Sequence, residues 1–433
     1  MAARVCRLHH VTLHVSNALR VADALASRFQ FAAVGARVTA SSRQLALRKG
    51  AAVFVVNERR HTGVTRNETK EHEHEHEHEH EHEHGYLYDV RPRYSVDSAC
   101  NVCFEVEDVA ESCARLSDRG CDVLVPPTEV RDPEGAGCVT YSVVQSIVGN
   151  VCHTLLDRSR YQGEFLPGFR RVGDGTDPKP DSRCRVTHFD HVTFACPRRS
   201  TREVMKWYEE NFGFQRFFIR SNEDVDEGYV LNQDGIGLRL TAMEYWKCSE
   251  TGLNIPFKDS QEPDCKFVIA ESLPEQGRNQ VDTFLEQHRG PGIQHIGLFT
   301  ENIVSTAQTM AKTGVEFFSP PPAYYTEVGK QQEILEAGHD PKELKQHGIL
   351  LDTDLGDHGG SSVPSGRYLL QVFTKPIFPE DTFFLELIER RGATGFGEGN
   401  IRALWRSVQS YMENEACGQR LDSEVKTKQT GQH

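Results

Sequence analysis

Apolar and polar residues alternate in four segments of the chain, and each segment precedes a stretch with the periodicity of an amphipathic helix. Alternation with a period of two predicts a half-buried strand, whereas apolar residues three and four positions apart predict a helix. The four predicted strands are Leu8–Val15, Asn101–Val106, Phe189–Cys196 and Gln294–Phe299. The helices that follow them are predicted to end near Arg28, Gly120, Gly213 and Gly314.

The first and third segments match in phrase and in order. Both contain His-Val-Thr, at residues 10–12 and 191–193, and the helix after each leads to Phe-x-Phe, at residues 29–31 and 212–214. The two halves of the chain therefore look like a duplication, in which each half holds two βαβββ units. Pairs of such units can close into an open sheet around an internal cleft. We predict an α+β fold of four βαβββ units in two duplicated half-barrel domains.

Residues 167–185 are dominated by Gly, Pro, Asp and Arg and have no periodicity, which is typical of a linker. We therefore predict an N-terminal domain at residues 1–166 and a C-terminal domain at residues 186–415. A disordered tail is predicted at residues 416–433.

Seven Glu-His pairs fill residues 71–84, which is the most conspicuous local feature of the sequence. The run has no apolar face and no turn residues, so nothing fixes a metal-binding geometry. We interpret it as a disordered insertion that binds metals only adventitiously. The polar segment 352–366 is also predicted to be a loop.

Composition narrows the class of protein. The chain has 433 residues, of which 38% are hydrophobic and 26% charged, and its formal net charge is −14. The acidic balance argues against general affinity for nucleic acid, and the lack of a long apolar run argues against a membrane span. The 12 cysteines are scattered, which favours free thiols in a reducing compartment.

The first 57 residues contain seven arginines and one lysine, and Asp23 is their only acidic residue. This composition is typical of mitochondrial targeting segments. The alternative is that the stretch forms the first strand and helix of a folded domain, and both interpretations can hold together. We expect a mitochondrial location, with the cytoplasm as the alternative.

A comparison of the halves singles out three positions in the C-terminal half. The corresponding pairs are His10 and His191, Asn101 and His295, and Thr154 and Glu386. Only the C-terminal half therefore has His, His and Glu, and we expect the N-terminal domain to be metal-free. Two imidazoles and one carboxylate on one face of an octahedron bind Fe(II) and leave three coordination positions open.

Each residue of this set also has an ordinary structural interpretation. A single strand histidine is more often a hydrogen-bonded core residue, and Glu386 could be an exposed residue of an edge strand. Their coincidence at equivalent strand positions favours the metal site. The other histidines compete less well, because His288 precedes a predicted turn and His339 and His347 lie in a polar helical region.

Several phrases of the C-terminal half resemble the 4-hydroxyphenylpyruvate dioxygenase family. They are Asp190–Val192, Gly292–Leu298, Leu369–Pro376, Phe383–Ile388 and Gly395–Asn400. The resemblance implies the vicinal oxygen chelate fold and one Fe(II) per chain at His191, His295 and Glu386, with no catalytic residue beyond the metal and the pocket. It also implies a substrate pocket formed by Gln280, Gln294, Gln371, Phe373, Phe384, Phe396, Asn400 and Ile401.

Two positions depart from the family pattern. Ala270 stands where the family usually has an Asn that holds substrate, and Ile401 stands where it has a Phe that packs on the aromatic ring. The related hydroxymandelate synthase also has Ile at the second position. We therefore expect benzylic rather than ring hydroxylation, with 4-hydroxymandelate as the product. A helix beginning at Ile401, with Asn400 as its N-cap, is expected to cover the site.

The expected partners are a small aromatic 2-oxo acid and O₂, without nucleic acid or a membrane span, and a homo-oligomer is compatible with the fold. The family further suggests that the product feeds synthesis of a quinone ring, as in coenzyme Q. Three alternatives remain open from the sequence. They are a homogentisate-forming dioxygenase of tyrosine breakdown, a non-catalytic binding or sensing protein, and an extradiol or glyoxalase-like enzyme.

Overall fold

The computed structural model describes residues 2–60, 86–172, 183–219, 223–225, 227–233, 236–245, 265–353, 367–393, 395–397 and 399–401. The predicted Glu-His insertion, the disordered tail and all but the first residue of the predicted covering helix lie outside these residues. Most of the predicted loop at 352–366 and the middle of the predicted linker also lie outside them.

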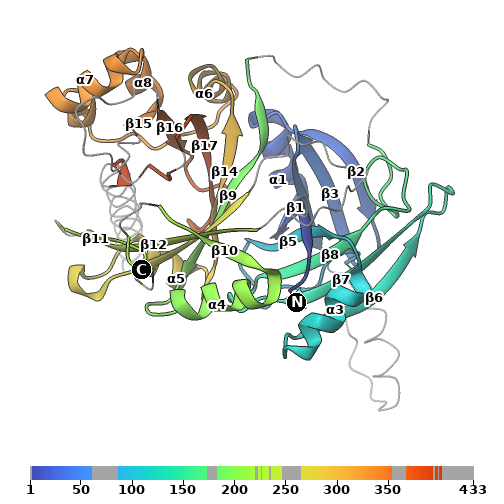
Figure 1. The fold of residues 1–433 in the computed structure, drawn as a ribbon. Helices are drawn as coiled ribbons and strands as arrows, with labels where there is room; N and C mark the ends of the chain where they lie inside the picture. Colours follow the sequence, from blue (N-terminus) through green and yellow to red (C-terminus); the bar gives the residue numbers. More distant parts are fainter. Residues whose placement is uncertain are drawn as a thin grey trace, which may run out of the picture.

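Two curled mixed sheets, one from each half of the chain, form the molecule (Figure 1). The first has the strand order β2-β3-β4-β1-β5-β8-β7-β6. Its strands are β1 (Val5–Val15), β2 (Ala32–Val38), β3 (Ser42–Lys49), β4 (Ala52–Arg59), β5 (Ser98–Val106), β6 (Val123–Arg131), β7 (Cys138–Gln145) and β8 (Cys152–Asp157).

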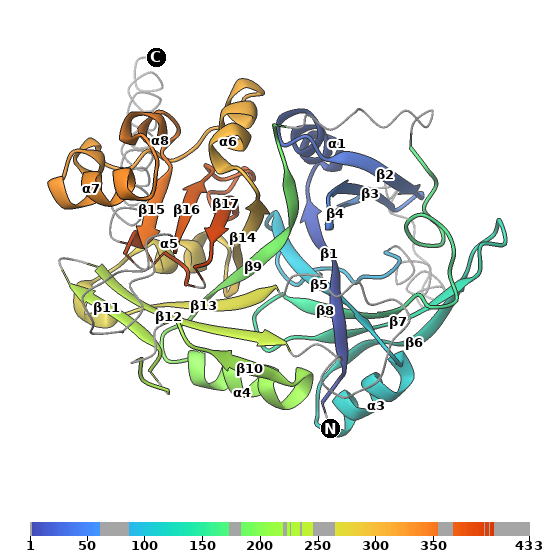
Figure 2. The same cartoon turned by 45° about the horizontal axis from the view of Figure 1, so that its top comes forward.

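The second sheet has the order β10-β12-β13-β9-β14-β17-β16-β15, with β11 paired to β12. Its strands are β9 (Val186–Cys196), β10 (Phe214–Phe217), β11 (Tyr229–Gln233), β12 (Ile236–Tyr245), β13 (Lys266–Ser272), β14 (Gly292–Thr300), β15 (Leu350–Thr353), β16 (Tyr368–Phe373) and β17 (Phe384–Arg391). In Figure 2 the two curled sheets lie beside each other.

The helices lie outside the curled sheets (Figure 2). They are α1 (Ala18–Asp23), α3 (Val109–Asp118), α4 (Thr201–Phe212), α5 (Gln280–Gln287), α6 (Ile303–Lys312), α7 (Val328–Glu336) and α8 (Pro341–His347). A π-helix continues α1 at Ala24–Arg28, and short 3₁₀ helices occur at Pro274–Gln276 and Pro322–Tyr325.

The predicted duplication is confirmed by the pairing of the strands. In the first sheet β1 pairs antiparallel with β5, and in the second β9 pairs antiparallel with β14. Each of these four central strands also pairs in parallel with the last strand of its own unit, which is β4, β8, β13 or β17. All four predicted strands and the helices after them are present, so the chain contains four βαβββ units with additional elements in the C-terminal half.

Local sequence explains where several helices begin and end. The side chains of Asn17, Asp108 and Asn302 accept a hydrogen bond from a backbone N–H in the first turn of α1, α3 and α6. Such caps satisfy donors that have no partner within the helix. At the other end of α4, Gly213 adopts a φ of 67°, a left-handed conformation that glycine adopts without steric cost.

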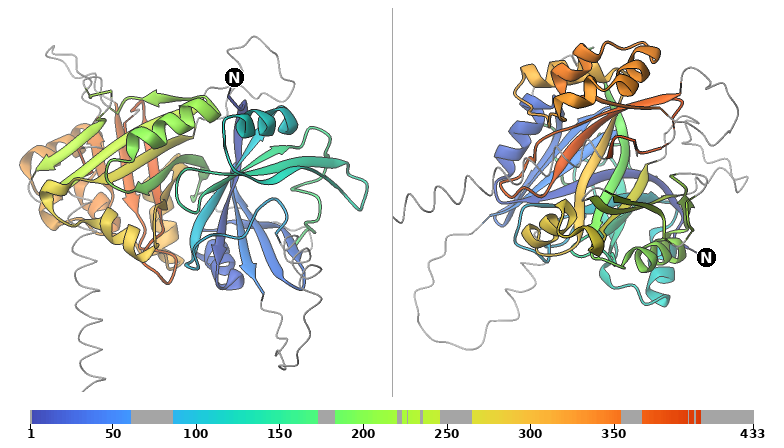
Figure 3. Two further views of the ribbon diagram at one scale, coloured as in Figure 1. Left: turned by 90° about the horizontal axis from the view of Figure 1, so that it is seen from below. Right: turned by 90° about the vertical axis from the view of Figure 1, so that its left-hand side faces the viewer.

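The halves share one apolar core, in which Phe54 of β4 meets Phe189 of β9 with ring centres 5.1 Å apart. The buried hydroxyl of Tyr208 on α4 lies 2.8 Å from Nε2 of His153 on β8, which joins the halves by a polar contact as well. Figure 3 shows that α3 and α4 lie at the seam between the halves. The exact domain boundaries stay a prediction.

The Arg-rich start of the chain forms part of the first domain, because β1 to β4 and α1 occupy most of residues 5–59. This confirms the second of the two interpretations of that stretch and leaves the expected mitochondrial location a prediction. In the described part of the chain, none of the helices has both the length and the apolar character that crossing a bilayer requires.

Candidate metal centre

The register of three neighbouring strands brings His191, His295 and Glu386 together. Gly297 of β14 pairs with His191 of β9 on one side and with Glu386 of β17 on the other. His295 lies two residues before Gly297, so its side chain is on the same face of the sheet. The three side chains therefore converge at the centre of the second sheet, as the sequence predicted.

The donor atoms of this group lie within 4.8 Å of one another. Nε2 of His191 is 3.1 Å from Oε2 of Glu386, and Nε2 of His295 is 3.6 Å from the same oxygen. Glu386 is buried between two other strands, which excludes its interpretation as an exposed edge residue. Two imidazoles and one carboxylate in this arrangement fit a divalent transition metal such as Fe(II).

A glycine makes room for the first histidine. A Cβ atom built at Gly297 would lie 2.3 Å from Cε1 and 2.4 Å from Nδ1 of His191, so the imidazole ring rests against the bare backbone of β14. At the equivalent position of the first sheet, His10 pairs with Cys103, which has a side chain. The glycine is thus part of the site, although the sequence pattern did not single it out.

Other side chains orient the three donors. Oδ1 of Asp190 lies 2.8 Å from Nδ1 of His191, which leaves Nε2 directed at Glu386. Arg390 donates two hydrogen bonds to Asp190, with lengths of 2.7 and 2.8 Å. A carboxylate behind a ligating imidazole is the usual support of a metal site. The sequence showed Asp190 next to His191, but nothing in it connected Arg390 to them.

The carboxylate of Glu386 has its own support. Nε2 of Gln371 donates to Oε1 of Glu386 at 2.9 Å, and Nδ2 of Asn400 donates to Oε1 of Gln371 at 3.2 Å. The hydroxyl of Tyr324 donates to Oδ1 of Asn400 at 2.8 Å. The described contacts of the Asn400 side chain are thus with the site, and the helix that it was predicted to cap lies outside the described residues.

The pKa values of the two imidazoles are shifted in opposite directions. Burial opposes a charge on His191, but the carboxylates of Glu386 and Asp190 outweigh it and raise the pKa of His191 to about 9. Burial and the charge of His191 lower the pKa of His295 well below its usual value. Burial would raise the pKa of Asp190, but Arg390 and His191 hold it well below its usual value. A positive charge on His191 is therefore stabilised between Asp190 and Glu386.

Aromatic rings position the second histidine. Phe384 stacks on His295 with ring centres 4.8 Å apart and an interplanar angle of 15°, and Phe373 meets the same ring edge-on at 6.3 Å. Phe396 lies 5.5 Å from the His191 ring. Nδ1 of His295 is buried and has no hydrogen-bond partner among the described residues. Packing rather than hydrogen bonding therefore fixes this ligand.

The predicted pocket residues fall into two groups. Gln371, Phe373, Phe384 and Phe396 contact the three donors, and Asn400 contacts Gln371. Their role in binding substrate stays a prediction. Gln294 is buried at a β-bulge next to His295, and Gln280 is the half-buried first residue of α5. Gln294 adjoins His295 in the chain, whereas no described contact joins Gln280 to the donors.

The two departures from the family pattern lie in one apolar cluster. Ile401 and Ala270 are both buried in it, together with Ala195 of β9 and with Val281 and Phe284 of α5. Ile401 is the last described residue. The sequence did not predict that these two positions would lie in one cluster.

The competing histidines are occupied elsewhere. His288 lies 2.8 Å from the carbonyl oxygen of Gly290, and His339 lies 3.1 Å from the hydroxyl of Tyr368. His347 is the last residue of α8. Outside the candidate centre, the described residues contain one more group of possible ligands, formed by His9, His10 and Cys103. The adjacent histidines were visible in the sequence, but their joint orientation results from a β-bulge in β1 that it did not reveal.

The equivalent place in the first sheet is closed by hydrogen bonds. Nδ2 of Asn101 donates to Oγ1 of Thr154 at 2.8 Å and to Oδ1 of Asp89 at 2.7 Å. Asn101 corresponds to His295 and Thr154 corresponds to Glu386, and the strand registers confirm this correspondence. Asn101 and Thr154 bond to each other where the C-terminal half presents metal-ligating groups.

Comparisons with known proteins agree with this architecture. Residues 188–344 match the glyoxalase/bleomycin resistance protein/dioxygenase superfamily. The chain is 43% identical over 413 residues to the 4-hydroxyphenylpyruvate dioxygenase-like protein of Rattus norvegicus, covering 94% of this chain and 98% of that relative. It is 30% identical over 318 residues to the 4-hydroxyphenylpyruvate dioxygenase of Yarrowia lipolytica, covering 72% of each.

A solved structure shares the fold. A triple mutant of 4-hydroxymandelate synthase from Streptomyces coelicolor superimposes with a TM-score of 0.65 at 21% identity, covering 94% of this chain and 99% of that chain. The predicted vicinal oxygen chelate fold, with two duplicated half-barrel domains, is therefore confirmed.

Replacing Gly297 by Ala should weaken metal binding by about 10- to 100-fold, the range seen when the support of a ligand is lost. The added methyl group would displace the His191 ring from its place against β14. Anaerobic calorimetric titration with Fe(II) measures the effect. Gly329→Ala is the matched control, because a Cβ there meets nothing within 4 Å. Equal affinities of the two variants would show that the ring position does not matter.

Proposed function

We propose that this chain, which belongs to the 4-hydroxyphenylpyruvate dioxygenase family, is an Fe(II)-dependent dioxygenase that converts 4-hydroxyphenylpyruvate and O₂ to 4-hydroxymandelate and CO₂. The observation that carries the proposal is the convergence of two imidazoles and one carboxylate, with donor atoms within 4.8 Å of one another, from three adjacent strands. The similarity of the chain to members of this family supports dioxygenase chemistry on this fold.

The residues present fit the proposed metal. One Fe(II) held by His191, His295 and Glu386 would activate O₂ and accept the carboxylate and keto oxygens of the substrate. Asp190 keeps Nδ1 of His191 engaged, so that Nε2 faces the metal position. Gln371 holds the second oxygen of Glu386, which fixes the orientation of the carboxylate.

The walls of the site suit an aromatic substrate. Phe373, Phe384 and Phe396 surround the donors and exclude water from one side. A dry, aromatic wall beside a few oriented polar groups is typical of pockets for small ligands. Because the substrate carries its own 2-oxo acid group, no separate keto acid is required.

The product follows from where the substrate ring can lie. Loss of CO₂ from the keto acid leaves one oxygen atom in the new carboxylate and one for hydroxylation, either of the ring or of the benzylic carbon. Ile401 and Ala270 form one apolar surface without the Phe and Asn of the family pattern. A shorter side chain at residue 401 lets the ring turn, and displacements of about 1 Å redirect such a step. We therefore favour the benzylic product.

One observation favours a second function. Ala270 offers no polar contact to a substrate and is buried among apolar residues, which suits a protein that binds the keto acid without turning it over. Supply of a quinone ring, as for coenzyme Q, and a mitochondrial location both stay predictions.

Anaerobic addition of 4-hydroxyphenylpyruvate to the Fe(II)-loaded protein should produce a visible charge-transfer band, because the keto acid chelates the metal through two oxygens. His295→Ala should abolish both the band and Fe(II) binding while circular dichroism stays unchanged. Deletion of residues 71–84, which removes seven histidines, is the control and should leave the band intact. A band that survives His295→Ala but is lost on deletion would place the metal in the Glu-His run.

Incubation with 4-hydroxyphenylpyruvate, Fe(II) and O₂ should yield mainly 4-hydroxymandelate, identified by mass spectrometry. Ile401→Phe should move the product ratio toward homogentisate by about tenfold or more, since positioning controls the step. Ile401→Leu, which conserves volume, serves as the control and should keep the benzylic product. Homogentisate as the main product of the unmodified chain would contradict the proposed regiochemistry, and no product at all would favour the binding protein.

A further inference from the structure

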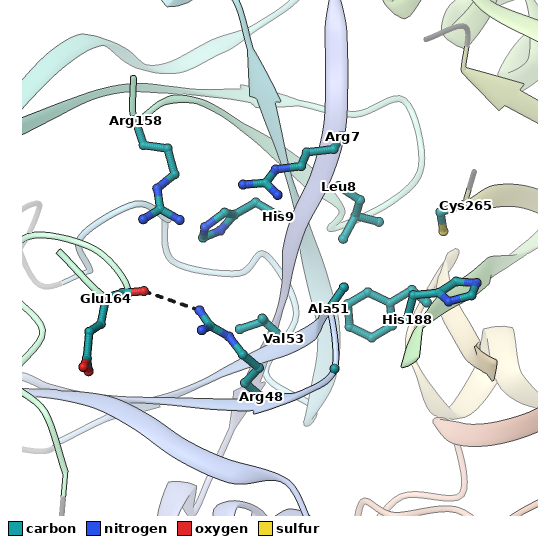
Figure 4. A pocket seen from close by; sticks show the side chains of 12 residues that line it. Arg7, Leu8, His9, Arg48, Ala51, Val53, Arg158, Glu164, His188 and Cys265 are labelled. Carbon is teal, nitrogen blue, oxygen red and sulfur yellow. Dashed lines mark hydrogen bonds between the residues drawn. The ribbon is translucent and has the colours of Figure 1, made fainter. Parts of the chain in front are cut away.

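A pocket of about 290 Å³ lies where the first sheet meets β9, away from the candidate metal centre. Its polar wall carries three guanidinium groups. The lining residues are Arg7, Leu8, His9, Arg48, Gly50, Ala51, Val53, Arg158, Glu164, His188, Phe189 and Cys265. Figure 4 shows Arg7, Arg48 and Arg158 around the ring of His9, with the apolar side chains on the opposite side. We refer to these lining residues as the arginine pocket.

The duplication relates this pocket to the support of the metal centre. A β-bulge separates Leu8 from His10 in β1, and an equivalent irregularity separates Phe189 from His191 in β9. His9 therefore occupies the position that Asp190 has in the second sheet. Thr154 corresponds to Glu386, so the residue four positions later, Arg158, corresponds to Arg390.

The carboxylate of the pair is missing from the first half. In the second sheet Arg390 donates two hydrogen bonds to Asp190. In the first sheet the arginine is retained, but it faces a histidine. Arg158 donates to the carbonyl oxygen of Gly163 at 3.2 Å and lies 5.8 Å from the centre of the Tyr161 ring. In the described part of the chain, no carboxylate lies within ion-pair distance of Arg158.

The potential in the pocket is positive although the chain as a whole is acidic. Burial lowers the pKa of His9 well below its usual value, and the charges of His10, Arg158, Arg7 and Arg48 lower it further. Two carboxylates lie at the pocket, and each has a partner. Glu105 pairs with Arg7 at 2.8 Å and lies 3.8 Å from Nε2 of His9. The exposed Glu164 pairs with Arg171 at 3.1 Å. An anion in the pocket would therefore be attracted by Arg158, whose described contacts are the carbonyl oxygen of Gly163 and the ring of Tyr161.

We propose that the arginine pocket binds a small organic carboxylate, whose carboxylate group pairs with Arg158 as Asp190 pairs with Arg390. A guanidinium group presents a planar fork that fits a carboxylate through two parallel hydrogen bonds. The body of the ligand would contact Leu8, Val53 and Phe189. The volume is at the lower end of the range for small-molecule pockets, which restricts the ligand to about the size of a single substituted ring.

The site is distinct from the proposed catalytic centre and does not depend on the proposed function. The pocket also contacts both halves, because His188 and Phe189 come from β9 and the three arginines come from the first half of the chain. A ligand there would thus touch the strand that carries His191.

Isothermal titration of the full chain with phenylacetate, in the presence of a metal chelator, tests the proposal. The chelator removes the metal centre as a competing site for carboxylates. Phenylacetate should bind, and the neutral phenylacetamide should bind at least about tenfold more weakly, since hydrogen bonds to a charged group are stronger than hydrogen bonds to a neutral one. If phosphate binds with the same affinity as phenylacetate, the pocket does not select a carboxylate with an apolar body, and the proposal is overturned.

Variants locate the binding. Arg158→Gln should reduce phenylacetate affinity by about tenfold or more. Arg160→Gln, at a neighbouring exposed arginine that pairs with Glu129, is the matched control and should bind like the unmodified chain. Equal binding by both variants would contradict the proposal.

A second pair of variants keeps the test decisive if Arg158→Gln is poorly folded. His9→Asp should give the first half a carboxylate at the position equivalent to Asp190. That carboxylate should pair with Arg158 and abolish phenylacetate binding. His9→Asn differs from it mainly by charge and should retain binding within a few fold. If His9→Asp binds phenylacetate as tightly as His9→Asn does, the pocket does not recognise a carboxylate through Arg158.

Discussion

The register between β9, β14 and β17 is the constraint on which the site depends. It places His191, Gly297 and Glu386 in one row across three strands, with His295 two residues away on the same face. A shift of one residue in either pairing would turn a donor to the opposite face of the sheet. The bare backbone of Gly297 supports the arrangement, because the His191 ring fills the place where a side chain would be.

Duplication explains both the site and its counterpart. The same backbone carries a pair of imidazoles and a carboxylate in one half and a closed Asn101–Thr154 hydrogen bond in the other. The supporting arginine persists in both halves, but only Arg390 has an internal carboxylate. The two halves thus differ in what they can bind. One half carries groups that fit a cation, and the other carries a pocket lined by arginines.

The sequence was sufficient for the opening strand and the first helix of each unit and for the alignment of the three donors, because alternation and the repeated His-Val-Thr phrase indicate which residues share a face. It was insufficient for contacts that depend on a β-bulge or on distant segments. The bulge that turns His9 toward Arg158 leaves no periodic trace. Ala270 and Ile401 are far apart in the chain, and only folding brings them into one apolar cluster. The sequence could not show whether Asn400 caps a helix or supports Gln371, because both roles use the same polar side chain.

Crystallographic anomalous scattering measured at the iron absorption edge tests the central claim most directly. The full chain would be crystallised anaerobically with Fe(II). The account predicts one anomalous peak per chain, bounded by His191, His295 and Glu386. A peak at the buried His9, His10 and Cys103 instead, with none at the centre of the second sheet, would contradict it.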